Sequence, residues 1–384
     1  MPDTADRLSL EPFTIDVPDE VLDDLRDRLA RTRWPEAIPG AGWDYGADVG
    51  AVRDLCAYWR DDYDWRRHEA RLNGPPQFLC EVDGVDLHFW HVRGAGPDPL
   101  PLLLVHGWPG SIFEFFELIG PLSDPAAHGG DPADAFDVVV AALPGFGFGG
   151  KPRERGWGIS RIAAAFDTLM SSALGYDRYG VQGGDWGSMV AAKLGAAYPE
   201  RVAGIHVNML VAPPPGRPGP EDAEALERDR VWRAREAAYS RVQRTKPDSL
   251  TVAQSDSPAG LAAWMVEKFR TWSDCDGDVE RVFSRDTLLT NLMFYWAPNS
   301  VASAARLYFE DLRDRAGLRA RPRVEVPVGY AEFPHEVVRP PRRWVEPHYA
   351  IARWTPMPRG GHFAALEEPQ LLLEDVRAFF RDVR

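Results

Sequence analysis

The sequence predicts an α/β fold with a mostly parallel sheet, a helical lid inserted into it, and an amino-terminal meander and helical extension. Buried strand patterns alternate with helical patterns from residue 101 to residue 208, which is typical of a parallel sheet with crossover helices. The alternation stops over residues 211–314, which are helical in pattern and rich in aromatic side chains, and it resumes at residue 326. A sheet interrupted in this way suits a binding site covered by a cap.

The amino-terminal extension is predicted to hold two helices and a hairpin. Apolar residues recur at helical spacing over residues 17–33, with charged residues on the opposite face, and Pro18 suits a first helical turn. A second helical pattern covers residues 49–63. Two β-rich runs then flank Asp83 and Gly84, a pair that favours a tight hairpin turn.

The main sheet is predicted to lie on both sides of the lid in the sequence. Before the lid, strand patterns lie at residues 102–107, within 136–149, at 178–182 and at 202–208, and helical patterns at 112–122, 159–174 and 189–198. After the lid, strand patterns lie at residues 326–333 and 349–355, and a final helical pattern at 370–382. We therefore expect an amino-terminal domain (1–95), a sheet domain (96–210 and 315–384) and a lid (211–314).

The composition disfavours several classes of protein. The 384 residues include 44 basic and 58 acidic side chains, and the net charge of −14 disfavours a nucleic-acid-binding surface. No apolar run approaches the ~18 residues of a membrane span, and the first ten residues lack the apolar core of a secretory signal. The three cysteines show no C-x-x-C spacing, which argues against a zinc cluster or a disulfide framework. We expect a soluble, cytoplasmic protein with no membrane or nucleic-acid partner.

The segment that says most about chemistry is GGDWG, residues 183–187, between a predicted strand and a predicted helix. Its glycines permit a sharp turn that projects Asp185 above the sheet. This is the geometry of a nucleophile elbow, with aspartate in the place that serine usually holds. For this segment alone, a tight turn in which Asp185 merely caps the helix stays open as the alternative.

A second segment supports the nucleophile elbow. HGWPG, residues 106–110, follows the first parallel strand, where one wall of an oxyanion hole is expected. The backbone amides of Trp108 and Trp186 could then stabilise negative charge on an ester of Asp185, whereas Pro109 has no amide hydrogen to donate. The alternative is a glycine–proline turn beside a structural histidine.

Two further candidate residues follow the lid. His362 is the only histidine after the final predicted strand, and the order nucleophile, acid, histidine is the one expected for such a sheet. Two glycines precede it, so we expect an exposed and mobile loop. The acid should follow the strand at 326–333. Glu336 is our choice, with Glu332 as the rival, because strand ends are uncertain by about two to four residues.

Together these motifs resemble a microsomal-type epoxide hydrolase of the α/β-hydrolase superfamily, in a soluble bacterial form. The similarity covers nearly the whole chain, and residues 10–95 resemble the amino-terminal epoxide hydrolase domain, including TRWPE (32–36) and YDWRRHEARLN (63–73). The motifs that resemble the catalytic domain are HGWPGS (106–111), LPGFGFG (143–149), GGDWGS (183–188) and GGHFAALE (360–367). The resemblance implies an α/β-hydrolase fold.

The resemblance also draws attention to two lid tyrosines, Tyr239 and Tyr308, which match the family's pair of acidic tyrosines. Opening an epoxide produces an alkoxide, and two phenols can donate hydrogen bonds to that charge. Each tyrosine alone is better explained by packing in the core or the lid, where a buried tyrosine commonly anchors its hydroxyl. As a pair, they are expected to bind the epoxide oxygen and, with Trp108 and Trp186, to line the substrate site.

The resemblance implies hydrolysis of an epoxide to a vicinal diol through an ester on Asp185. His362, oriented by Glu336, would activate the water that hydrolyses the ester, with neither cofactor nor metal. The tryptophan-rich lid favours an apolar, aromatic epoxide, and a role in secondary-metabolite biosynthesis fits the residues as well as a role in detoxification. A homodimer is compatible with the aromatic residues of the extension.

Two other functions stay open at this stage. A haloalkane dehalogenase would share the aspartate elbow and the HG-x-P motif, but it would hold halide with tryptophan or asparagine N–H groups. The tyrosine pair and the amino-terminal extension favour the epoxide. A non-catalytic α/β-hydrolase scaffold that only binds a ligand is the second alternative, because a fold does not by itself establish activity.

Overall fold

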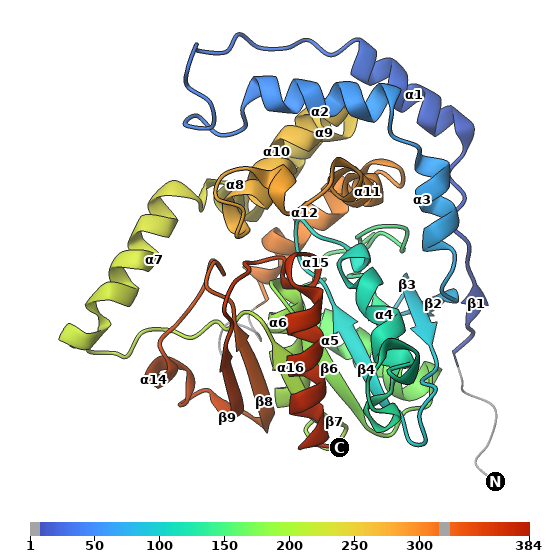
Figure 1. The fold of residues 1–384 in the computed structure, drawn as a ribbon, viewed down its shortest axis with the longest axis vertical. Coiled ribbons are helices and arrows are strands. Elements are labelled where there is room, and N and C mark those ends of the chain that lie inside the picture. The colour runs from blue at the N-terminus through green and yellow to red at the C-terminus, as the bar shows by residue number, and fades with distance from the viewer. Residues whose placement is uncertain (1–7, 315–322) are drawn as a thin grey trace.

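The computed structural model describes residues 8–314 and 323–384, and within these ranges the strands form a single nine-stranded sheet (Figure 1). The order across the sheet is β1-β2-β3-β5-β4-β6-β7-β8-β9. The strands are β1 (Glu11–Pro12), β2 (Gln77–Val82), β3 (Val85–Val92), β4 (Leu100–Val105), β5 (Phe136–Ala141), β6 (Tyr179–Gly183), β7 (Val202–Val207), β8 (Val324–Glu332) and β9 (Tyr349–Pro356). All neighbours from β5 to β9 pair in parallel, which confirms the mostly parallel sheet.

The predicted hairpin at the start of the sheet is confirmed. Strands β2 and β3 pair antiparallel, and Asp83 and Gly84 between them have φ angles of 51° and 75°. Both central residues are left-handed, as a two-residue hairpin turn with the right twist requires. Strand β3 pairs antiparallel with β5, so the amino-terminal segment extends the main sheet at its edge.

Helices cover both faces of the sheet. Helices α4 (Phe116–Ser123) and α16 (Pro369–Arg381) pack together on the face toward the viewer in Figure 1, and α5 (Ile159–Thr168) and α6 (Trp186–Ala197) pack together on the opposite face. Every residue of the central strands β5 and β7 is buried. This double cover explains the continuous apolar strands that the sequence shows.

The predicted helical lid is confirmed between β7 and β8. Its helices are α7 (Ala223–Arg235), α8 (Ala238–Thr245), α9 (Pro247–Asp256), α10 (Pro258–Trp272), α11 (Arg285–Trp296) and α12 (Val301–Asp311). The proline-rich stretch 211–219 precedes the first helical turn and leads the chain away from the sheet. The lid helices α8 to α12 lie above the carboxyl ends of the parallel strands (Figure 1).

The amino-terminal helices are α1 (Asp19–Ala30), α2 (Val49–Asp61) and α3 (Trp65–Leu72). The first two are shorter than the sequence predicts, and α3 was missed. It begins where the Asp64 carboxylate accepts hydrogen bonds from the amides of the first helical turn. Helices α1 and α2 lie across the lid (Figure 1). Between α2 and α3, the Tyr63 hydroxyl lies 2.9 Å from Thr290 Oγ1 of the lid helix α11. The amino-terminal extension therefore reaches from the edge of the sheet to the outer side of the lid helices α10 and α11.

The structure was also searched for membrane-spanning segments. In the two described ranges, no helix combines the length and the apolar character needed to cross a membrane.

Candidate active site

Asp185 occupies the turn between β6 and α6, as the sequence predicts. Its φ and ψ angles are 48° and −123°, a backbone conformation that side chains other than glycine seldom adopt. A Cβ atom added to Gly187 would lie 1.8 Å from the Val105 carbonyl oxygen, so only glycine lets α6 start this close to β4. The strained turn lifts the Asp185 carboxylate to the carboxyl end of the sheet.

Two backbone amides act on the Asp185 carboxylate. The Trp108 amide donates a hydrogen bond to Oδ1 at 2.9 Å. Burial raises the pKa of Asp185, while the nearby His362 and the amides of Trp108 and Trp186 act in the opposite direction. Both amides proposed from the sequence therefore act on this carboxylate.

The lid holds the loop that carries Trp108. Asn291 Nδ2 donates to the Pro109 carbonyl oxygen at 2.8 Å, and the Tyr295 hydroxyl donates to the Gly110 carbonyl oxygen at 2.6 Å. Both side chains come from α11 and are fully buried. The position of the Trp108 amide thus depends on the lid as well as on the sheet.

His362 and Glu336 lie next to Asp185. His362 Nε2 is 3.6 Å from Asp185 Oδ2, and Nδ1 is 2.8 Å from Glu336 Oε1. Burial alone would lower the pKa of His362, but the carboxylates of Glu336 and Asp185 outweigh it and raise this pKa to about 9. The rival acid, Glu332, instead accepts a hydrogen bond from Trp354 Nε1 at 2.9 Å on the neighbouring strand.

The expected exposure of the His362 loop is wrong. His362 is 5% exposed and Gly361 is buried, because the end of helix α10 packs directly on this loop. Glycine is needed here for close approach, since a Cβ atom on Gly361 would lie 2.6 Å from the Trp272 carbonyl oxygen. Paired glycines therefore mark a packing contact at this position.

Tyr239 of α8 and Tyr308 of α12 are both buried under the lid. The Tyr239 ring stacks on Trp108 with centroids 5.0 Å apart, and the Tyr308 ring meets Trp186 edge-on at 4.7 Å. Burial raises the pKa of both phenols, and the charge of Asp185 adds to this effect. The Tyr308 hydroxyl is buried and makes no hydrogen bond of good geometry within the described residues, although Tyr239 and Trp186 lie close enough to act on its pKa. A buried donor without a well-formed hydrogen bond is costly unless a ligand meets it.

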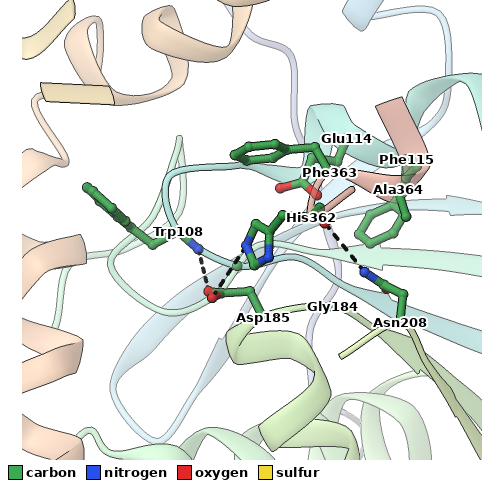
Figure 2. A pocket seen from close by; sticks show the side chains of 11 residues that line it. Trp108, Glu114, Phe115, Gly184, Asp185, Asn208, His362, Phe363 and Ala364 are labelled. Carbon is green, nitrogen blue, oxygen red and sulfur yellow. Dashed lines mark hydrogen bonds and ion pairs between the residues drawn. The ribbon is translucent and has the colours of Figure 1, made fainter. Parts of the chain in front are cut away.

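A small pocket beside the Asp185 carboxylate is lined by two residues that the sequence analysis missed. Figure 2 shows Glu114 and Asn208 beside Asp185 and His362 around this pocket, which neither tyrosine lines. Asn208 Nδ2 lies 3.5 Å from the His362 carbonyl oxygen. Burial raises the pKa of Glu114 to about 8, so this acid stays mostly protonated at neutral pH. Within the described ranges, no group of three or more histidine, cysteine, aspartate or glutamate side chains is arranged so that it could hold a metal ion.

Comparison with known proteins gives this geometry a family. Residues 10–115 match the family model "Epoxide hydrolase N terminus", and residues 101–270 match the model "alpha/beta hydrolase fold". A protein of Stigmatella aurantiaca (strain DW4/3-1), whose name also assigns it to the epoxide hydrolases, is 42% identical over 98% of this chain and 86% of its own length. The chain belongs to the microsomal-type epoxide hydrolase family. It is an epoxide hydrolase.

Two other epoxide hydrolases match this epoxide hydrolase over nearly its whole length. "Epoxide hydrolase 1" of Oryctolagus cuniculus is 37% identical over 97% of this chain and 88% of its own length. The crystal structure of the juvenile hormone epoxide hydrolase of Bombyx mori superposes with a TM-score of 0.90, with 29% identity over 99% of this chain and 96% of that one. The expected α/β-hydrolase fold is confirmed by these matches and by the sheet.

Proposed function

We propose that this epoxide hydrolase acts in two covalent steps through an ester on Asp185. The observation that carries the proposal is that the two oxygens of the Asp185 carboxylate face different partners, the Trp108 amide and the His362 ring. Oδ1 accepts the Trp108 amide, whereas Oδ2 faces His362 Nε2 at 3.6 Å. Oδ2 is the oxygen proposed to attack, and Oδ1 would become the ester carbonyl oxygen beside the Trp108 amide.

In the first step, Asp185 Oδ2 forms a bond to one carbon of the epoxide as that carbon's bond to the ring oxygen breaks. The electron pair of the broken bond stays on the ring oxygen, which takes a proton from one phenol. Tyr239 and Tyr308 lie on the lid helices α8 and α12, and their rings pack on Trp108 and Trp186 beside the carboxylate, which supports this role. The product of the step is a hydroxyalkyl ester of Asp185.

In the second step, water attacks the ester carbonyl carbon. His362 takes the proton of this water, and Glu336 stabilises the imidazolium through Nδ1. The amides of Trp108 and Trp186 hold the negative charge that develops on Oδ1. When the bond between the ester oxygen and the carbonyl carbon breaks, the leaving oxygen takes the proton from His362 and the diol departs. Asp185 keeps the oxygen of the water, and the second proton of that water returns to the phenolate left by the first step.

The substrate is proposed to be an apolar epoxide with an aromatic or similarly flat substituent. Aromatic rings pack together around the tyrosine pair, which excludes water and offers flat apolar surfaces. They belong to Trp108, Trp186, Tyr239, Trp272 and Tyr308. The binding free energy at such walls depends on the apolar area that the substrate buries rather than on its charge.

A single turnover in ¹⁸O-water with enzyme in excess over styrene oxide tests the ester. The expected result is one ¹⁸O atom in the peptide that contains Asp185, with an unlabelled diol. Enzyme incubated in the same water without epoxide is the control and should stay unlabelled. Label in the diol of the first turnover, with none in Asp185, would show direct attack of water on the epoxide and would end the proposal. Halide release from a matched haloalkane, without diol formation, would favour a dehalogenase.

A further inference from the structure

One turn of the lid, residues 272–274 at the end of α10, contacts the loop that carries His362. The His362 amide donates to the Trp272 carbonyl oxygen at 2.9 Å. The Asp274 amide donates to Glu367 Oε2 at 2.8 Å, and the other oxygen of Glu367 accepts the Phe363 amide at 2.8 Å. The lid turn is thereby joined to the backbone on both sides of the His362 ring.

The side chain of Asp274 adds a second kind of contact. Its Oδ2 accepts the Gly360 amide at 2.9 Å, two residues before His362. Its Oδ1 lies 3.1 Å from His335 Nε2, one residue before Glu336. One carboxylate thus bridges the loop of the proposed base and the loop of the proposed acid.

The fit between these segments is close. A Cβ atom added to Gly361 would lie 2.9 Å from the Ser273 Cα atom and 3.1 Å from the Asp274 amide nitrogen. The two loops also meet each other, because the His335 amide donates to the Gly360 carbonyl oxygen at 3.1 Å. A loop held on two sides in this way keeps its side chain in one place, and catalysis is sensitive to displacements of about 1 Å.

We propose that Asp274 is a positioning residue for ester hydrolysis, which holds His362 and Glu336 in register from the lid. This inference rests on the two-step reaction proposed above. Asp274 acts only through the two loops. Its removal should therefore slow the step that needs His362 and spare the attack of Asp185 on the epoxide.

Stopped-flow measurement of each step tests this assignment, with Asp274→Ala, Asp274→Asn and the full-length wild type. Tryptophan fluorescence follows ester formation and decay, because Trp108 and Trp186 flank the nucleophile. Asp274→Ala should slow ester decay by roughly 10- to 100-fold and ester formation by less than about 3-fold. Asp274→Asn keeps an oxygen for the Gly360 amide and should recover part of the loss. Asp276→Asn is the matched control, since the Asp276 carboxylate pairs with Arg281 in the neighbouring turn.

Equal slowing of both steps, or unchanged ester decay in Asp274→Ala, would overturn the assignment. If Asp274→Ala does not fold, as judged by circular dichroism, Asp274→Asn and His335→Gln carry the test, and one of them must slow decay selectively. The reaction itself is checked separately by trapping the ester in wild type and His362→Gln. If neither protein forms an ester, the proposed function fails, whatever the Asp274 variants show.

Discussion

His362 Nε2 lies 3.6 Å from Asp185 Oδ2, a separation wider than a hydrogen bond, while its other ring nitrogen is held by Glu336 at 2.8 Å. The imidazole is thus fixed by the acid and only faces the nucleophile. This arrangement leaves Nε2 available to a water molecule once Asp185 has become an ester. This relationship is the reason for proposing that His362 acts in the second step, and it leads to the first two predictions.

His362→Gln should form the ester and then fail to hydrolyse it. Loss of a positioned general base should slow the decay by roughly 10²- to 10⁴-fold. Intact-protein mass spectrometry after mixing with styrene oxide should show an adduct of one epoxide mass. His128→Gln, at an exposed histidine, is the control and should show wild-type turnover. An unmodified His362→Gln protein would argue that His362 also serves the first step.

The pH dependence of ester decay should reveal how His362 becomes a base. In the free enzyme, the carboxylates of Glu336 and Asp185 raise its pKa to about 9, so the ring is charged at neutral pH. Ester formation removes the charge of Asp185, and this pKa must then fall. The rate of ester decay should therefore rise with pH and reach its plateau below pH 9. A midpoint at or above pH 9 in single-turnover experiments would contradict this coupling.

Tyr239→Phe and Tyr308→Phe should each slow ester formation while leaving ester decay nearly unchanged. Removing one donor from a site of developing negative charge costs roughly 10²- to 10³-fold. The double variant should be slower still, because no phenol then meets the ring oxygen. Tyr45→Phe is the control, since Tyr45 is 81% exposed. Rapid-quench measurement of the ester separates the two steps, and an effect confined to decay would assign the phenols to the wrong step.

Glu114→Gln should become more stable than the wild type as the pH rises. The folded protein holds the Glu114 proton up to about pH 8, whereas the unfolded chain loses it near the ordinary value of 4.5. Between these values the folded state binds more protons, so the wild type loses stability as pH rises. The variant lacks this group, and its advantage should grow from pH 5 to pH 8 and then level off. Urea unfolding at pH 5, 7 and 9 would measure this, and a constant difference would contradict the burial of Glu114.

Gly187→Ala should destabilise the fold by about 3 kcal/mol, a typical upper cost of overpacking, because the new methyl group would meet the Val105 carbonyl oxygen. Gly216→Ala is the matched control, since a Cβ atom there would meet nothing within 4 Å. Thermal unfolding of both variants compares them directly. Equal melting temperatures would mean that the turn at Asp185 can relax.

Residues governed by local backbone chemistry could be predicted from the sequence. The glycines around Asp185 predict a sharp turn. Asp83 and Gly84 predict a hairpin in the same way, because both residue types accept the positive φ angles that such a turn needs. The sequence did not decide between Glu336 and Glu332 as the acid, because the residue at which β8 ends is set by its pairing with the neighbouring strand β9. Strand β8 runs to Glu332, whose side chain turns to Trp354 on β9.

Contacts between distant segments could not be predicted. Glu114 follows Ser111 in an S-x-x-E pattern that ordinarily indicates a helix cap, and Ser111 does cap the turn that follows it. Nothing in that pattern shows that Glu114 lies near His362. The burial of the His362 loop depends in the same way on a lid turn about ninety residues earlier in the chain.

The contact between the amino-terminal extension and the lid limits which residues of this protein can be changed by engineering. Tyr63 reaches Thr290 of α11, and α2 packs along α10. A library aimed at new epoxides should therefore keep the outward sides of α10 and α11, on which the extension rests. Diversity belongs on the positions of α8 and α12 that lie beside Tyr239 and Tyr308, with both tyrosines kept.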